Sequence, residues 1–434
     1  MLKKYLQNKI YTRITGESRF VMENNHPSAD NFYIKFHDIT ELGLYLHIPF
    51  CHYICPYCPY NKELYQDDLV KRYTASVIKE IDYYASIIGR RPVTSFYIGG
   101  GTPTTMLGNG IESIIDYIYK AFNMKCHVHI ESHPNDLSQK NLDNLKSLGV
   151  KYLSVGLEAL QDKHLKTLNR PYSVSEVAQA IDRAVNMGFD CVNVDFIFAL
   201  PGQTYEEIEQ AGHGLVNMGV QQAATYPLFR FPYTQIGQNL IKKESGIPLL
   251  FKRRKMLRIL EDIFYDAGFY RSSVWAFTRE GTEKYCSVTV PLYLGLGASG
   301  GSYLKDIFFL NTFNVTEYIK TIEQNKMPVA LSVDLSENMQ MAGWLYWRIY
   351  ETRFNKNDFE KRFKTGFDSK YGKEMKILSR IGFLNDDGQE IALTDKGAYW
   401  LHAFEDWFSI DFIGKLWGNS KNVPWPDKVV LTEG

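Results

Sequence analysis

The segment LGLYLHIPFCHYICPYC, residues Leu42–Cys58, contains the two features that decide the fold expected for this chain. Its first part, Leu42–Ile48, is almost continuously apolar, which is typical of a strand buried on both faces of a parallel sheet. Directly after this strand come three cysteines in the spacing C-x3-C-x2-C, at Cys51, Cys55 and Cys58. The segment therefore predicts a buried strand that leads into a cysteine-bearing loop.

Strand and helix patterns alternate downstream of this segment. Residues Asp67–Ile88 carry apolar side chains at steps of three and four, which predicts an amphipathic helix. Further apolar strands are predicted at residues 95–100, 126–132, 152–157, 191–200 and 223–229, with a helical pattern between each strand and the next. This order predicts an α/β fold in which parallel strands and helices form a partial or full (β/α) barrel.

Polar residues and glycines mark the ends of successive strands. The cysteine loop follows the first strand, GGGTPTT (Gly99–Thr105) ends the second, Glu131 the third and Glu158 the fourth, and Asp195 lies in the fifth. Because the carboxyl ends of the strands meet at one face of such a barrel, these residues predict a functional site at that face.

We expect four regions: an N-terminal extension (1–41), the barrel with its cysteine loop (42–245), a completion of the barrel with a glycine-rich segment (246–331) and a C-terminal cap domain (332–434). The last region contains two or three helical patterns and an Asp-Gly turn between apolar runs, which predicts a hairpin. Helices followed by a small hairpin indicate a winged-helix-like module. Since the net charge is zero, we expect a lid or substrate-binding cap there and no DNA binding.

The composition limits which kinds of partner and which cellular compartment we expect for this protein. A net charge of zero without a basic run gives no reason to expect nucleic acid as a partner. The chain has no apolar run long enough for a membrane span, and its first residues lack the apolar core of a signal peptide, so we expect a cytoplasmic protein. Thiols are kept reduced in that compartment, and the three clustered cysteines therefore predict a metal site.

The number and spacing of the cysteines indicate which metal site this is. A structural zinc site uses four ligands at other spacings, and a thioredoxin-like role for Cys55 and Cys58 does not account for Cys51. Three thiolates on one loop fit an iron–sulfur cluster in which one iron has no protein ligand. That iron could bind a reactant, as the open position of a catalytic zinc does.

This motif, with Tyr57 just before the last cysteine and a glycine-rich second strand end, resembles that of the radical S-adenosylmethionine (radical SAM) superfamily. The order of the blocks YLHIPFC, FYIGGGTPT, IESHPND, LSVGLEALQDKHLKTLNRPY and VNVDFIFALPGQT is similar to that of the oxygen-independent coproporphyrinogen III oxidases and their relatives. These relatives include haem chaperones, anaerobic haem-degrading methyltransferases and class C radical methyltransferases. The resemblance is clearest from Tyr45 to Thr204.

The resemblance implies a [4Fe–4S] cluster held by the three cysteines, with S-adenosylmethionine chelated to the open iron. An electron from a donor such as flavodoxin or ferredoxin would cleave S-adenosylmethionine to methionine and a 5′-deoxyadenosyl radical. By the same resemblance, Glu131 would lie near the amino group of S-adenosylmethionine, Arg170 would pair with its carboxylate and Asp195 would bind its ribose. The full set of matching positions is Tyr45, Tyr57, Gly99, Gly100, Gly101, Thr102, Glu131, Glu158, Arg170, Asp195 and Tyr226.

A second S-adenosylmethionine is often bound in this branch, and LGLGASG (Leu294–Gly300), with Gly295 and Gly297, resembles a stretch that contributes to the second site. Two positions depart from the oxidases: Tyr60 stands where they usually carry a further cysteine, and Glu158 replaces a common glutamine. The departures favour methyl or methylene transfer to an sp2 carbon of an aromatic or tetrapyrrole substrate.

Two alternatives remain for the function. One is oxidative decarboxylation of coproporphyrinogen III, for which Arg13 and Arg19 are candidate partners of the substrate's propionates. The other is a haem chaperone, for which His47, His52 and the methionine pair of ENMQMAG (337–343) are candidate haem ligands.

Overall fold

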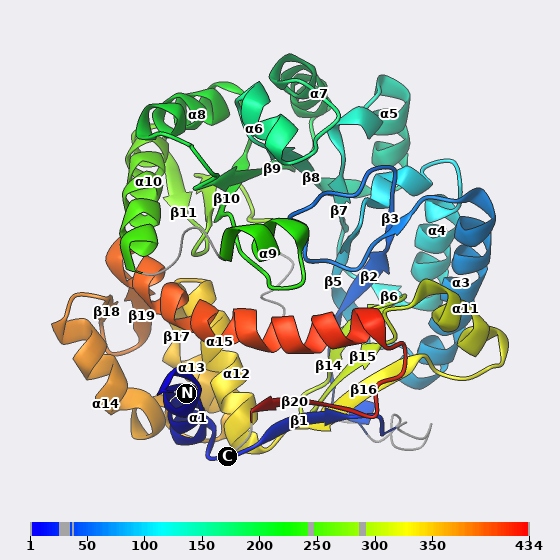
Figure 1. Ribbon diagram of the computed structural model, residues 1–434. Helices are drawn as coiled ribbons and strands as arrows, with labels where there is room; N and C mark the ends of the chain where they lie inside the picture. The colour runs from blue at the N-terminus through cyan, green and yellow to red at the C-terminus, as the bar shows by residue number, and fades with distance from the viewer. Residues whose placement is uncertain (1, 26–34, 37–38, 242–246, 286–291, 433–434) are drawn as a thin grey trace.

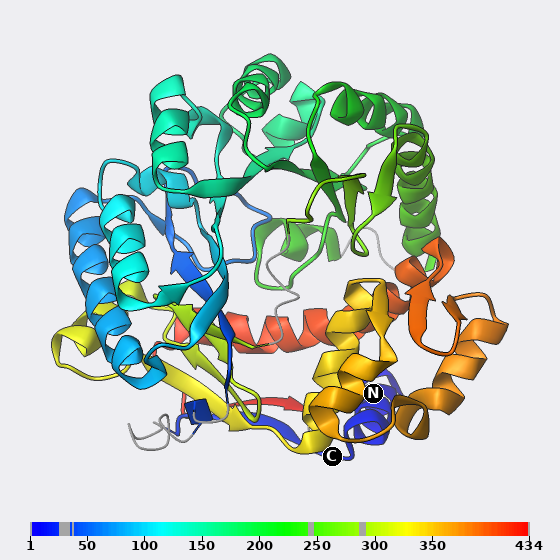
Figure 2. The same ribbon diagram turned by 180° about the vertical axis from the view of Figure 1, so that it is seen from behind.

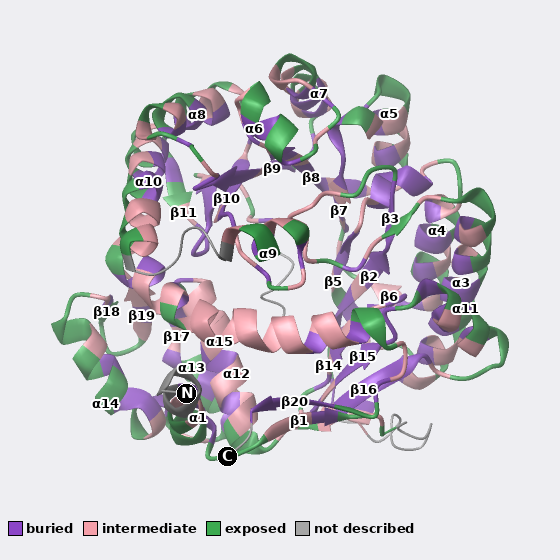
Figure 3. Ribbon diagram, viewed as in Figure 1, coloured by how far each residue is buried: buried purple, intermediate pink, exposed green. Residues whose placement is uncertain are grey.

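The computed structural model describes residues 2–25, 35–36, 39–241, 247–285 and 292–432. Six parallel strands lie next to one another in chain order, as the sequence predicts. They are β2 (Leu42–Ile48), β5 (Pro92–Gly100), β7 (Val128–Ser132), β8 (Val150–Glu158), β9 (Cys191–Phe198) and β10 (Gln222–Pro227). Most residues of these strands are buried, which agrees with their largely apolar pattern (Figure 3).

Helices connect these strands and cover their outer side (Figures 1 and 2). The connecting helices are α3 (Asp67–Ile88), α4 (Ile111–Ala121), α5 (Gln139–Ser147), α6 (Asp162–Thr167), α7 (Val174–Asn186) and α8 (Tyr205–Asn217), and α10 (Ile247–Asp266) packs beside α8. Serine and threonine caps start α5, α7 and α8, and each cap accepts a backbone N–H of the first turn. None of the helices in the described ranges is both long and apolar enough to cross a membrane.

The barrel is partial, because the sheet continues away from the six strands on both sides. Beyond β10 lie the antiparallel strands β12 (Ala276–Arg279) and β11 (Phe269–Arg271). On the other side, β13 (Tyr293–Leu296) pairs parallel with β2. It is followed by the antiparallel strands β14 (Gly301–Tyr303), β15 (Ile307–Asn311), β16 (Val329–Asp334), β1 (Phe20–Glu23) and β20 (Lys428–Thr432). Strands from both ends of the chain therefore complete one sheet, and the expected boundary at residue 332 falls inside β16.

The C-terminal region contains a small helical unit and one long helix. The helices α12 (Glu337–Tyr350), α13 (Lys356–Phe363) and α14 (Phe367–Arg380) pack with a sheet of β17 (Arg353–Asn355), β19 (Glu390–Leu393) and β18 (Leu384–Asp386) around a core that includes Trp344 and Phe359. The predicted hairpin is present as β18 and β19. The long helix α15 (Asp395–Asn422), which the sequence did not predict, crosses the open side of the barrel (Figure 1).

Candidate active site

The cysteine loop is anchored at both of its ends by a short ladder. Strand β3 (Phe50–Cys51) pairs in parallel with β4 (Glu63–Leu64). The N–H of Tyr65 donates to the carbonyl oxygen of Cys51 over 3.0 Å, and the N–H of Glu63 donates to that of Pro49 over 2.7 Å. Because β3 follows almost directly on β2, the ladder holds the loop at the carboxyl end of β2, where the sequence predicts it.

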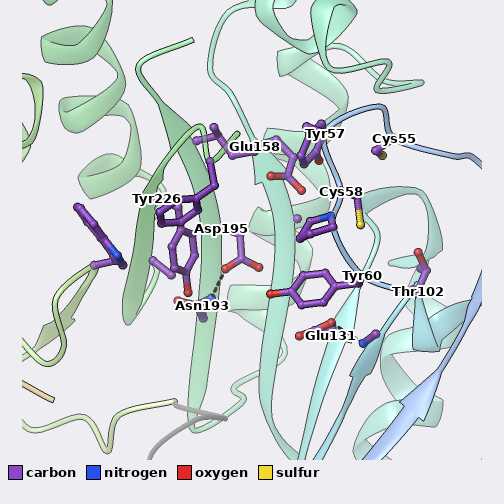
Figure 4. A pocket seen from close by; sticks show the side chains of 18 of the residues that line it. Cys55, Tyr57, Cys58, Tyr60, Thr102, Glu131, Glu158, Asn193, Asp195 and Tyr226 are labelled. Carbon is purple, nitrogen blue, oxygen red and sulfur yellow. Dashed lines mark hydrogen bonds between the residues drawn. The ribbon is translucent and has the colours of Figure 1, made fainter. Parts of the chain in front are cut away.

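A cavity of about 860 Å³ opens at this end of the sheet, between the cysteine loop and the strand ends (Figure 4). Side chains from β7, β8, β9 and β10 point into it, as expected for the carboxyl ends of parallel strands. The predicted site residues that line it are Cys51, Cys55, Tyr57, Cys58, Gly100, Gly101, Thr102, Glu131, Glu158, Arg170, Asp195 and Tyr226.

All three loop cysteines are free thiols that face this cavity. The hydroxyl of Thr102 lies 3.4 Å from the sulfur of Cys51, and Nη1 of Arg170 lies 3.2 Å from that of Cys55, so each can donate to a thiolate. Burial raises the pKa of the Cys51 thiol to about 12, and a bound metal would supply the positive charge that its ionisation needs. Separate thiols around one cavity, each able to bind a different iron, fit an iron–sulfur cluster.

That arrangement differs from a site for one metal ion. Within the described ranges, no three histidine, cysteine, aspartate or glutamate side chains converge on a point where a single ion could be held. A cluster does not require such convergence, because its thiolates bind different irons.

Glu131, at the end of β7, is held in place by two donors. The hydroxyl of Tyr97 donates to Oε1 over 2.6 Å and the N–H of Gly100 donates to Oε2 over 3.1 Å, while Tyr285 in turn donates to the Tyr97 hydroxyl. Burial raises the pKa of Glu131. Gly99 does not line the cavity, but a Cβ at this position would come within 2.9 Å of the Glu131 carboxylate, so glycine leaves the space that Glu131 occupies.

Arg170 connects the cysteine loop to the end of β8. Its Nη2 donates to the carbonyl oxygen of Gly156 over 2.7 Å and lies 3.3 Å from Oε1 of Glu158, and its Nε donates to the Tyr172 hydroxyl. Glu158 has a φ of 67°, a conformation that a glutamate rarely adopts and that persists where surrounding contacts enforce it. Burial raises the pKa of Glu158, and Arg170 opposes this shift.

Asp195 is a third buried carboxyl group in the same cavity. The hydroxyl of Ser154 donates to its Oδ2 over 2.8 Å, and Nδ2 of Asn193 lies 3.2 Å from its Oδ1. Burial, followed by the charges of Glu158 and Glu131, raises the pKa of Asp195 to about 7. This end of the cavity is therefore rich in carboxyl groups.

Two predicted cofactor residues, Gly295 and Gly297, lie away from the cavity. A Cβ at Gly295 would be 2.2 Å from the carbonyl oxygen of Gly301, and one at Gly297 would be 2.2 Å from the hydroxyl of Tyr73. The structure accounts for Gly295 by the close approach of β14 to β13, and for Gly297 by the packing of Tyr73 against the backbone. Neither residue lines the cavity.

Other candidates from the sequence also lie outside the cavity. Tyr45 bonds through its hydroxyl to Nδ1 of buried His47 (2.9 Å), and neither residue lines the cavity. The side chain of Arg13 is 83% exposed and lies 3.7 Å from Glu374, and Arg19 is also exposed. Neither of these two arginines, which are candidate partners of the propionates, lines the cavity.

Sequence reasoning missed the wall of the cavity that faces the cysteines. Helix α12 contributes Tyr346, Trp347 and Tyr350. Helix α15 contributes residues from four successive turns, which are His402, Asp406, Ser409, Ile410 and Ile413. In α12 the sequence signal for this wall is the spacing of Tyr350 from Tyr346 and Trp347, four and three residues, which places aromatic side chains on one helix face. In α15 the apolar residues are spread around the helix, so they give no such signal, and most of this helix is only partly buried (Figure 3).

Helix α15 also contacts the cysteine loop. The ammonium group of Lys421 donates to the carbonyl oxygens of Pro59 (2.9 Å) and Tyr60 (3.2 Å). The rings of Tyr60 and Trp417 lie 5.8 Å apart. Tyr60, which replaces the further cysteine of the oxidases, thus lines the cavity while α15 holds its backbone and its ring.

Comparison with known proteins identifies a family model and relatives that this chain resembles. Residues 45–213 match the model of the Radical SAM superfamily. The heme chaperone HemW of Bacillus subtilis (strain 168) is 25% identical over 360 residues, which cover 81% of this chain and 95% of that protein. The oxygen-independent coproporphyrinogen III oxidase of Escherichia coli (strain K12) is 22% identical over 378 residues, which cover 82% of each protein.

A solved structure shares the fold. The coproporphyrinogen III oxidase (HemN) from Escherichia coli, described as a radical SAM enzyme, superposes with a TM-score of 0.76 at 21% identity. The match covers 88% of this chain and 93% of that one. It extends beyond the residues that match the family model, so the shared fold is not confined to residues 45–213.

Proposed function

Because residues 45–213 form a radical SAM domain, we propose that this protein is an enzyme that carries out radical chemistry on a flat conjugated ring of tetrapyrrole size. Proteins of this family use a [4Fe–4S] cluster and S-adenosylmethionine, which supply one-electron chemistry when bound. A one-electron donor such as flavodoxin or ferredoxin would reduce the cluster. The protein's own residues then have to bind, orient and shield the reactants.

A single observation carries the proposal: one cavity joins the cysteine loop to an aromatic wall. On the cysteine side, Glu131, Arg170 and Asp195 provide hydrogen-bonding groups for the polar parts of S-adenosylmethionine. On the other side, Tyr226 and Trp347 offer flat apolar surfaces on which a conjugated ring can stack. The relatives described above, a heme chaperone and a coproporphyrinogen oxidase, are named for tetrapyrroles, which supports a ring of this kind.

Three finer functions differ in what they require of the cavity. Methyl or methylene transfer to an sp2 carbon remains a candidate, but the glycines expected at a second S-adenosylmethionine do not reach the cavity. Decarboxylation of coproporphyrinogen III, which carries four propionates, is less favoured by charge. Of the described lining residues, Lys62 and Arg170 are the only lysine and arginine, and Lys62 donates to the carbonyl of Cys58 while Arg170 is engaged as above. Haem binding without turnover is the non-enzymatic outcome.

The test is anaerobic reconstitution with iron and sulfide, followed by incubation with S-adenosylmethionine and dithionite, with and without haem or coproporphyrinogen III. Formation of 5′-deoxyadenosine by the wild type and by Cys126→Ala, and its loss in Cys55→Ala, supports the proposal. A product that gains CH2 identifies methyl transfer, and loss of carbon dioxide with two hydrogens identifies oxidative decarboxylation. A cluster-loaded protein that binds haem but forms no 5′-deoxyadenosine would contradict the enzymatic proposal.

A further inference from the structure

The aromatic side of the cavity contains a histidine without a hydrogen bond. His402 of α15 is only 5% exposed and lines the cavity, and within the part of the chain that the structure describes neither of its ring nitrogens makes a hydrogen bond. Nδ1 faces Oδ1 of Asp406 at 3.5 Å, which is beyond a good hydrogen bond. The rings of Trp275 (5.1 Å) and Tyr350 (5.6 Å) fix the imidazole.

A second unpaired polar group lies beside it. The indole Nε1 of Trp275 has no hydrogen-bond partner among the described residues, although Trp275 is 3% exposed and lines the same cavity. A buried polar group that stays unpaired costs about 1–3 kcal/mol. Two such groups at one end of a cavity indicate that a ligand is missing from this place.

We propose that His402 is an axial ligand of the iron of a porphyrin bound in this cavity, and that Asp406 orients the imidazole. The inference rests on the proposed tetrapyrrole-sized substrate and names it as an iron porphyrin. Histidines that bind metals commonly donate their other ring N–H to a carboxylate, which fixes the tautomer. A small movement of Asp406 toward Nδ1 gives this bond and leaves the lone pair of Nε2 for the iron.

The other histidines suggested by the sequence or near the cavity are less suited. Nδ1 of His133 accepts the N–H of Asn135 over 3.2 Å, so the proton is on its other nitrogen and that nitrogen cannot bind iron. Both nitrogens of His47 are bonded, to a tyrosine hydroxyl and to a backbone carbonyl. His52 is exposed on the cysteine loop. In contrast to these histidines, His402 combines burial among aromatic rings with a carboxylate near Nδ1.

The aromatic side of the cavity has surfaces that suit a porphyrin. The whole cavity has a volume of about 860 Å³, near the upper end of the usual range for ligand pockets, about 300–1,000 Å³, and the cluster and S-adenosylmethionine would occupy its other side. The indole N–H of Trp275 can donate to a propionate carboxylate on the rim of the macrocycle. Tyr350, whose ring lies against His402, and Phe229, 6.5 Å from it, form apolar surfaces around the iron position.

The experiment is a titration of the full chain with ferric haem, followed by absorption, magnetic circular dichroism and electron paramagnetic resonance. We expect one haem per chain with the signature of histidine-ligated iron. His402→Ala should lose this signature and bind haem at least about tenfold more weakly, and added imidazole should restore the signature. His402→Met should retain the haem with a methionine-ligated spectrum, which keeps the test valid if the alanine variant folds poorly. His52→Ala and His133→Ala are the matched controls and should resemble the wild type.

Other results would overturn the inference. They are an unchanged histidine signature in His402→Ala, or metal-free protoporphyrin bound as tightly as haem by the wild type. Formation of 5′-deoxyadenosine is a separate measurement, and it tests the proposed function. Formation of this product without haem binding leaves the function standing and removes His402 as a ligand. Haem ligation by His402 without this product removes the enzymatic function and supports a haem carrier.

Discussion

Nη1 of Arg170 lies 3.2 Å from the sulfur of Cys55, although 115 positions separate the two residues in the sequence. The same guanidinium reaches the end of β8, where it meets Gly156 and Glu158. One planar group with several fixed donors therefore connects the cysteine loop to the strand ends. This contact explains why the loop and the barrel form a single site.

Replacement of Arg170 tests this connection. Arg170→Lys keeps the charge but loses the forked geometry, so we expect the chain to take up a normal amount of iron and sulfide. We expect 5′-deoxyadenosine formation to fall about tenfold or more, because lysine cannot make the bidentate contact with a carboxylate. The control is Arg183→Lys, because the guanidinium of Arg183 donates to the carbonyl of Leu137 on the outer layer, away from the cavity. This variant should have wild-type activity. Equal activity of both variants would contradict the role of Arg170.

The pKa of Asp195 predicts how binding of S-adenosylmethionine depends on pH. In the free protein this pKa is raised to about 7. If the carboxylate accepts ribose hydroxyls, the carboxyl group must lose its proton to bind, so affinity should rise as pH rises from about 6 to about 8. The slope below the pKa is up to tenfold per pH unit. Equilibrium dialysis should show this rise in affinity for the wild type. For Asp195→Asn the affinity should be lower and should not change with pH. An affinity of the wild type that does not change with pH would refute the role of Asp195 in binding the ribose.

Glu80 of α3 predicts a pH dependence of stability. Its carboxylate accepts from the N–H of Gly297, from Asn311 and from the Tyr318 hydroxyl, yet burial raises its pKa from 4.5 to about 7. The folded state therefore holds the proton more tightly than the unfolded state. Between these two pH values the free energy of unfolding should fall as pH rises, by roughly 3 kcal/mol at most. Urea unfolding at several pH values should show this fall for the wild type and a smaller one for Glu80→Gln.

Helix α15 should determine how long the cluster is retained. Trp417→Ala removes the ring that packs on Tyr60, so the cysteine loop should open more often. We expect iron to be lost to a chelator several-fold faster, because local opening controls access to a buried site. Trp400→Ala changes the same helix at a tryptophan that packs on Phe251, and it should lose iron at the wild-type rate. Equal rates for Trp417→Ala and the wild type would show that this contact does not hold the loop.

Gly297 distinguishes a packing role from a cofactor role. Gly297→Ala places a methyl group 2.2 Å from the Tyr73 hydroxyl at a φ of 88°. Gly281→Ala meets nothing within 4 Å at a φ of 80°, so it measures the backbone cost alone, about 1 kcal/mol. We expect Gly297→Ala to lower the free energy of unfolding by more than Gly281→Ala. Its affinity for S-adenosylmethionine per folded molecule should be unchanged, and a selective loss of affinity would restore the cofactor interpretation.

The sequence predicts the elements whose patterns are local. The bounds of β2 and α3 agree with the predicted ones, because a strand buried on both faces and an amphipathic helix each leave a regular pattern. The position of Glu131, Glu158 and Asp195 around one cavity followed from strand order alone. In contrast, β1 forms only by pairing with β16 and β20, which are some 300 to 400 residues away, and no local pattern encodes such a partner.

The aromatic wall of the cavity could not be predicted from the sequence for a similar reason. Tyr350 and His402 line the cavity only because α12 and α15 fold back over the barrel. Nothing around His402 in the sequence marks it as different from a core histidine. Its distinguishing property, an imidazole left without a hydrogen bond beside Asp406, exists only in three dimensions.

The crossing of α15 over the barrel has a consequence for how the protein is made. Along the chain, α15 and β20 come after every strand of the barrel and after the three cysteines. Chains emerge from the ribosome N-terminus first, and domains begin to fold during synthesis. The barrel and its cysteine loop are therefore complete while the side that α15 will cover is still open. This order of synthesis leaves an interval in which iron and sulfide, or the proteins that deliver them, can reach the loop before the last helix closes over it.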